Sequence, residues 1–154
     1  MESRLDFQKT VPQAYRIMVS LETYIRNAVL EPELLKLVKL RASQINGCAL
    51  CIDMHSKEAR ADGETEQRIY ALSAWRETPF FTDRERAALA WTEAVTLISD
   101  NRVPDEVYQE TQQRFTEQEL ANLTMTIVTI NSWNRLCISF RTVPGSYVPK
   151  NVHV

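Results

Sequence analysis

The segment with the most chemical content is Cys48-Ala49-Leu50-Cys51-Ile52-Asp53-Met54-His55. Two residues separate the cysteines, so their sulfur atoms can approach closely enough to form a small-loop disulfide. His55 follows Cys51 by four residues, which places both side chains on one face of a helix, one turn apart. An imidazole there can accept the Cys51 proton and stabilise the thiolate as an ion pair. The spacing therefore predicts that Cys51 is the activated thiol and Cys48 its disulfide partner.

The cysteines also stand where a helix is expected to begin. Asn46-Gly47 ends the preceding apolar pattern, because glycine readily adopts the left-handed conformation that closes many helices. A helix from 48 to about 61 puts both cysteines in its first turn. Its N-terminus carries roughly half a positive charge and free N–H groups, which favour thiolate over thiol. We therefore expect the pKa of Cys51 to lie below the ~8.5 of a free thiol.

Two other interpretations of the motif stay open. A structural zinc site could use Cys48, Cys51 and His55, since cysteine and histidine both bind zinc. Its fourth ligand would have to be Cys137 or His153, and no second C-x-x-C or H-x₃₋₅-H accompanies the motif. The cysteines could instead be buried fillers, a common role for this residue type. We expect no metal and no other cofactor, and we interpret Cys137, on an apolar segment, as a core residue.

Composition limits the class of protein. The 154 residues are 44% hydrophobic and 25% charged, as expected for one globular domain. The net charge is −2 with both signs interspersed, so nucleic acid is not an expected partner. No run approaches the ~18 apolar residues of a membrane span, and the N-terminus lacks a signal-peptide pattern. We expect a single cytoplasmic domain over 1–154 without membrane contact, in which 145–154 forms a tail or arm.

Helical periodicity dominates the chain. Apolar residues recur at steps of three and four, and no useful length alternates with period two. The β-branched run 124–130 favours a strand on propensity alone, but it follows a capping box, which favours a buried helix. We therefore predict an all-α fold, with helices over 12–29, 33–45, 48–61, 65–76, 83–99, 104–115 and 117–140.

The stretch 37–55, with its S-Q-I-N-G-C-x-x-C-x-x-x-H run, resembles the core motif of AhpD-like alkylhydroperoxidases in the carboxymuconolactone decarboxylase superfamily. The likeness extends to 131–135 and 144–147. It implies a single-domain helical bundle, a trimeric or hexameric homo-oligomer, and a dithiol that reduces hydroperoxides and is reset by an external thiol or dithiol reductant. It also implies that Cys51 is the peroxidatic cysteine, Cys48 the resolving cysteine and His55 the base beside them.

The chain departs from the family pattern at two places. The family usually has a glutamate twelve residues before the first cysteine, as part of a proton relay, and here that residue is Lys36. Glu33, one turn earlier, and Glu93, on a later helix, are the carboxylates that could substitute. The AhpD enzymes also carry a histidine between the cysteines, where this chain has Ala49 and Leu50.

These features predict a thiol-dependent hydroperoxide reductase with an antioxidant role. Two alternatives remain. One is a cofactor-free lyase acting on a lactone, as in the other branch of the superfamily, for which a redox-active dithiol is not required. The other is a non-catalytic assembly protein whose dithiol senses oxidants. Trp75, Trp91 and Trp133 lie on helical stripes and are expected in the core or in subunit contacts, which favours a homo-oligomer.

Overall fold

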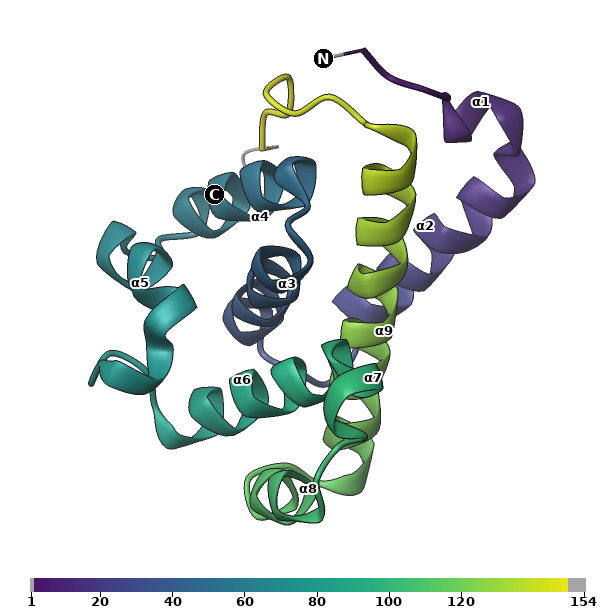
Figure 1. Ribbon diagram of the computed structural model, residues 1–154. Helices are drawn as coiled ribbons and strands as arrows, with labels where there is room; N and C mark the ends of the chain where they lie inside the picture. Colours follow the sequence, from purple (N-terminus) through teal and green to yellow (C-terminus); the bar gives the residue numbers. More distant parts are fainter. Residues whose placement is uncertain (1, 150–154) are drawn as a thin grey trace.

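The computed structural model describes residues 2–149, and all regular structure within that range is helical (Figure 1). This confirms the predicted all-α class. The elements are α1 (Phe7–Thr10), α2 (Pro12–Arg26), α3 (Pro32–Asn46), α4 (Ala49–Ala61), α5 (Glu66–Ala71), the 3₁₀ helix η1 (Leu72–Glu77), α6 (Asp83–Thr96), α7 (Ile98–Asn101), α8 (Asp105–Gln112) and α9 (Glu117–Phe140).

Helix α3 lies at the centre of the fold and packs against α4, α6 and α9 (Figure 1). The long α9 runs along one side of α3, and α2 packs on α9. The largest core cluster joins α2, α3, α6 and α9 through buried side chains that include Ile25, Val38, Leu123 and Ile127. Trp75 and Trp91 are buried, whereas Trp133 is only partly covered.

Capping boxes fix the starts of α6 and α9. The Thr82 side chain accepts a hydrogen bond from the Glu85 backbone N–H, and the Glu85 carboxylate accepts one from the Thr82 N–H. Thr116 and Glu119 make the same pair of bonds at the start of α9. The run 124–130 continues that helix, so local capping outweighs β propensity here.

Several predicted helix ends were wrong. The helix expected over 65–76 changes at Leu72 into a 3₁₀ turn with a non-helical residue, Ala74. The guanidinium of Arg86 donates hydrogen bonds to three carbonyls of this region, which satisfies groups that a regular helix would have paired. The helix expected over 83–99 breaks at Leu97.

Three smaller differences remain. Helix α2 ends at Arg26 rather than near 29, and α8 ends at Gln112 rather than near 115. The short α1, capped by Asp6, was not predicted. A single turn of helix carries too little periodic pattern to be read from sequence.

The C-terminal segment follows α4 as far as it is described. The backbone N–H of Gly145 donates to the Asp53 carboxylate at 3.1 Å, and the Lys57 ammonium donates to the Tyr147 carbonyl at 3.2 Å. The rest of the predicted tail, 150–154 with His153, lies outside the described residues. None of the helices in 2–149 is both long and apolar enough to cross a membrane.

Candidate active site

The junction between α3 and α4 places the cysteines. Gly47 closes α3 in the left-handed conformation, with φ of +69°, which glycine adopts without the strain that a Cβ would bring. Cys48 follows as the N-cap of α4, and its N–H donates to the Ser43 carbonyl at 3.0 Å. Cys51 therefore lies in the first turn of α4, as predicted.

The two cysteines form a disulfide, with Cα atoms 5.4 Å apart. Their side chains are 1% and 2% exposed and pack with Ala42 and Ile130 in a small apolar cluster. When this disulfide is reduced, both thiols lie at the N-terminal end of α4.

His55, one turn beyond Cys51, is 4% exposed and begins a chain of hydrogen bonds. Its Nδ1 lies 2.8 Å from Glu58 Oε2, and the Tyr147 hydroxyl donates to Glu58 Oε1 at 2.6 Å. Although burial opposes ionisation, the bonds from His55 and Tyr147 hold the pKa of Glu58 below its ordinary value. Burial and the bond to Glu58 raise the pKa of Tyr147, so its hydroxyl stays a donor.

This network assigns the tautomer of His55. An ionised Glu58 accepts the proton on Nδ1, which leaves a lone pair on Nε2. His55 Nε2 is the one buried side-chain nitrogen or oxygen between residues 2 and 149 that lacks a hydrogen-bond partner. His55 shares a helix face with Cys51, and an imidazole nitrogen that carries a lone pair can accept a proton.

Lys36, at the relay position of the family, lies elsewhere. Its ammonium forms an ion pair with Asp62, just beyond the C-terminal end of α4. The 13 residues of α4 span about 18 Å, so this pair and the cysteines are at opposite ends of the helix. Glu33 lines a small hollow together with Lys36 and Asp62. Neither Lys36 nor Glu33 is therefore placed to relay protons for Cys51.

Glu93 is held in a cluster of ion pairs. Its Oε1 accepts hydrogen bonds from Arg41 Nη2 at 2.7 Å and Trp75 Nε1 at 2.8 Å, and its Oε2 accepts one from Arg76 at 2.7 Å. Both oxygens are thus occupied between α3, η1 and α6, which gives Glu93 a structural role. The carboxylate that contacts His55 is that of Glu58.

Sequence reasoning missed both Glu58 and Tyr147. Glu58 had a usable signal, since it follows His55 by three residues on the same helix. Helical spacing gave no signal for Tyr147, because its bond to Glu58 spans 89 residues; only its place in the family-like run 144–147 marked it.

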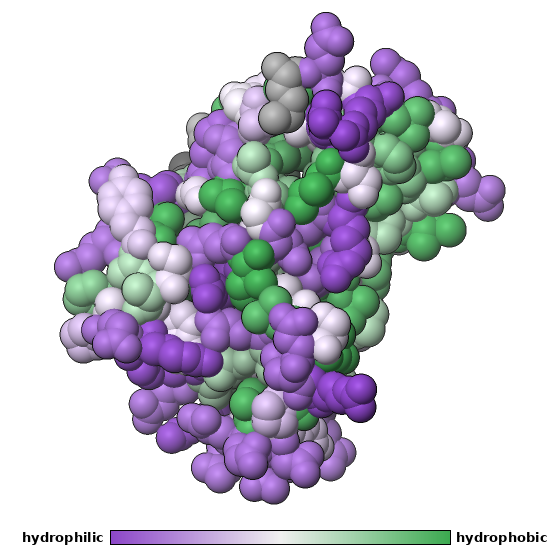
Figure 2. Space-filling model, in the orientation of Figure 1, coloured by the Kyte–Doolittle hydropathy of each residue, from purple (hydrophilic) through white to green (hydrophobic). Residues whose placement is uncertain are grey.

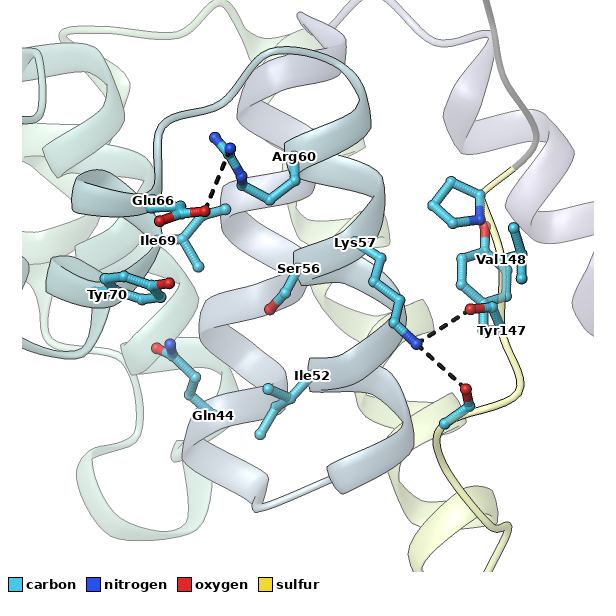
Figure 3. A pocket seen from close by; sticks show the side chains of 12 residues that line it. Gln44, Ile52, Ser56, Lys57, Arg60, Glu66, Ile69, Tyr70, Tyr147 and Val148 are labelled. Atoms are coloured by element: carbon cyan, nitrogen blue, oxygen red, sulfur yellow. Dashed lines mark hydrogen bonds and ion pairs between the residues drawn. The ribbon is translucent and has the colours of Figure 1, made fainter.

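An open groove of about 790 Å³ runs along α4 beside this network (Figure 3). Ile52, Ile69 and Tyr147 give it apolar walls, and Lys57 and Arg60 add positive charge. Figure 3 shows the Lys57 ammonium reaching across to the carbonyls of the C-terminal segment. Neither cysteine lines the groove, but Tyr147 belongs both to its wall and to the His55 network.

Comparison with known proteins decides the family. The model of the carboxymuconolactone decarboxylase family matches residues 12–94, more than half of the chain. The chain belongs to this family. Within it, this AhpD-like chain is 43% identical over 139 residues to the uncharacterized protein YdfG of Bacillus subtilis (strain 168), covering 90% of this chain and 95% of that one.

Solved structures agree with that assignment. A protein of unknown function from Agrobacterium tumefaciens, provisionally named antioxidant defence protein AhpD, is 41% identical, with a TM-score of 0.92 over 95% of this chain and all of that one. The debrominase Bmp8 is 19% identical, with a TM-score of 0.81 over 90% of this chain and 75% of that one. At that identity, Bmp8 shows a shared fold alone.

Proposed function

We propose that this protein reduces hydroperoxides with the Cys48–Cys51 dithiol, as part of antioxidant defence. The observation that carries the proposal is the cysteine pair at the start of α4, followed by a buried histidine whose Nδ1 is bound to Glu58 and whose Nε2 is unpartnered. The similarity to AhpD-like proteins supports it.

The first step oxidises Cys51. His55 Nε2 accepts the thiol proton, and the thiolate attacks the terminal oxygen of the hydroperoxide. A sulfur–oxygen bond forms as the oxygen–oxygen bond breaks, which leaves a sulfenic acid on Cys51 and an alkoxide. The imidazolium returns its proton to the alkoxide, and an alcohol leaves. Glu58 stabilises the imidazolium while it exists.

The second step forms the disulfide. The Cys48 sulfur attacks the sulfur of the Cys51 sulfenic acid, the sulfur–oxygen bond breaks, and hydroxide leaves as water with the Cys48 proton. An external thiol or dithiol then supplies two electrons and two protons to restore both thiols. The sum converts one hydroperoxide into one alcohol and one water, and it requires no metal or organic cofactor.

A stopped-flow peroxide titration with thiol counting tests this function. The reduced wild type should lose two thiols per chain rapidly, and Cys137→Ser, the matched control, should lose the same two. Cys51→Ser should show no rapid disulfide formation. Rapid loss of two thiols in Cys51→Ser, or none in the wild type, would contradict the proposal.

A second candidate, a redox sensor, is favoured by the near-complete burial of both sulfur atoms. A sensor forms the disulfide once and persists in that state, whereas a reductase turns over as long as peroxide and dithiol are supplied. Steady-state peroxide consumption therefore separates them. A lactone-cleaving lyase would have no use for the dithiol, so unchanged lyase activity in Cys51→Ser would identify that alternative.

The proposal includes a cytoplasmic homo-oligomer. Apolar side chains that include Val11, Ile17 and Val19 are exposed around α2, where Figure 2 shows a hydrophobic area at the upper right. Burial of such a surface in a symmetric interface above ~1,000 Å² would stabilise a trimer or hexamer. Light scattering that gives the mass of a monomer at micromolar concentration would contradict this.

A further inference from the structure

A third cysteine lies beside the disulfide. Cys137, on α9, is 86 residues from Cys51 in the sequence, yet the Sγ atoms of Cys48, Cys51 and Cys137 all lie within 4.8 Å of one another. Cys137 packs against the apolar cluster of the other two cysteines, but it is not one of the buried core residues, contrary to the prediction from its sequence. Its side chain is only partly buried, so solvent reaches this side of the cluster.

The spacing of the three sulfur atoms suits a metal ion. Thiolates that bind one zinc ion at ~2.3 Å lie about 3.8 Å apart in a tetrahedral site. Once the disulfide is reduced, shifts of about 1 Å or less bring all three sulfur atoms to that separation. Zinc and other thiophilic cations are the ions that such a set of ligands selects.

Side-chain amides join the C-terminal end of α3, just before Cys48, to α9, which carries Cys137. The Asn46 amide donates to Asn134 Oδ1 at 2.8 Å, and the Asn134 amide donates to Ser43 Oγ at 3.1 Å. Asn134 is fully buried and precedes Cys137 on α9 by three residues. The end of α3, which leads into Cys48, is thereby fixed against the turn of α9 that carries Cys137. Ligands on fixed helices form a more precise site than ligands on loops.

His55 supplies an independent observation. Its Nε2 is buried and without a hydrogen-bond partner in the described part of the chain, while its Nδ1 is bound to the Glu58 carboxylate. Histidines that bind zinc through one nitrogen almost always donate the other N–H to a carboxylate or carbonyl in this way. His55 also lies one helical turn beyond Cys51, on the same face of α4.

We propose that the reduced protein binds one Zn²⁺ through the thiolates of Cys48, Cys51 and Cys137. His55 Nε2 lies outside the 4.8 Å group of sulfur atoms in the disulfide form, and it becomes the fourth ligand when the reduced site rearranges around the ion. The carboxylate of Glu58 orients this histidine. Three thiolates and a neutral imidazole leave the bound ion with a net charge of −1, which the positive N-terminal end of α4 offsets in part. This site goes beyond hydroperoxide reduction, in which Cys137 takes no part.

Zinc and the disulfide exclude each other. The oxidised protein lacks two of the four ligands, so only the reduced protein should bind the ion.

Titration of the reduced protein with Zn²⁺ under anaerobic conditions, against a chromophoric chelator, tests the site. The wild type should bind one equivalent, and Cys137→Ser and His55→Ala should each bind at least about tenfold more weakly. Ser139→Ala is the matched control, since Ser139 is an exposed residue of α9 near Cys137, and it should bind as the wild type does. The oxidised wild type should not bind. Absence of binding by the reduced wild type, or unchanged affinity in either ligand variant, would overturn the proposal.

A measurement on the wild type alone guards against variants that fail to fold. Co²⁺ in place of Zn²⁺ should give intense ligand-field bands of a tetrahedral ion and charge-transfer absorption from three thiolates. Bands of an octahedral ion, or charge-transfer intensity of fewer than three thiolates, would overturn the site. Because neither measurement uses peroxide, failure of this site and failure of the reductase are distinguishable.

Discussion

Glu58 and Glu93 are both partly buried helical carboxylates, and they differ in the kind of partner that holds them. Glu93 lies between two arginines and a tryptophan, whereas Glu58 lies between His55 and Tyr147. A guanidinium only donates hydrogen bonds and does not exchange its proton in a reaction, so the arginines hold Glu93 as fixed donors. An imidazole nitrogen can accept a proton and later donate it. We therefore expect the Glu58 network, and not the Glu93 cluster, to take part in proton transfer.

Removal of the histidine should give the largest effect. His55→Ala deletes the base and proton donor, and we expect the rate of peroxide reduction to fall by about 10²-fold or more. Stopped-flow measurement of Cys51 oxidation gives this rate. A rate within about twofold of the wild type would mean that the Glu58 network does not serve the cysteine.

Exchange of the two carboxylates for amides sharpens the comparison. Glu58→Gln should lower the rate of peroxide reduction by about tenfold, because the imidazolium loses its counter-charge. Glu93→Gln should leave that rate unchanged and lower the free energy of unfolding by about 1–2 kcal/mol, since two arginines lose their partner. Glu58→Gln should therefore be the slower variant in the kinetic assay, and Glu93→Gln should be the less stable variant in urea denaturation.

The pH dependence of stability separates the two sites further. The pKa of Glu58 is lowered on folding from an ordinary value of 4.5. A group with a depressed pKa stabilises the fold above its unfolded pKa, and that contribution is lost as the pH falls through the folded value. Below pH 4.5 the wild type should lose more stability than Glu58→Gln does. Parallel curves of unfolding free energy against pH would count against an ionised Glu58.

The tyrosine should give the smallest effect. Tyr147→Phe removes one hydrogen bond to Glu58, worth about 1 kcal/mol, which corresponds to a roughly fivefold slower reaction. Peroxide kinetics at neutral pH measure it. A loss as large as that of His55→Ala would mean that Tyr147 acts on the reacting atoms themselves.

The sequence predicts features that depend on neighbours along the chain. Helix periodicity, the capping boxes at Thr82 and Thr116, and the glycine stop before Cys48 are local, and all are present in the structure. His55 has the predicted place on α4 for the same reason. Helix interruptions such as Ala74 depend on distant donors like Arg86 and could not be predicted.

The rest of the site depends on tertiary contacts. Tyr147 reaches Glu58 across 89 residues, and Cys137 reaches the disulfide from another helix. The Lys36–Asp62 pair likewise could not be inferred from spacing to Cys48, because it depends on how α3 packs against α4. Such contacts arise when helices dock, and no helical period encodes them.

The rate of alkylation of reduced Cys51 against pH, with Cys48 and Cys137 replaced by serine, tests the central claim most directly. Activation by the α4 N-terminus and His55 predicts an inflection below ~8.5, the value of a free thiol. His55→Ala should move the inflection upward, Glu58→Gln should move it upward by less, and Glu93→Gln should leave it in place. An inflection at or above the free-thiol value with His55 and Glu58 intact would contradict the claim that this network activates Cys51.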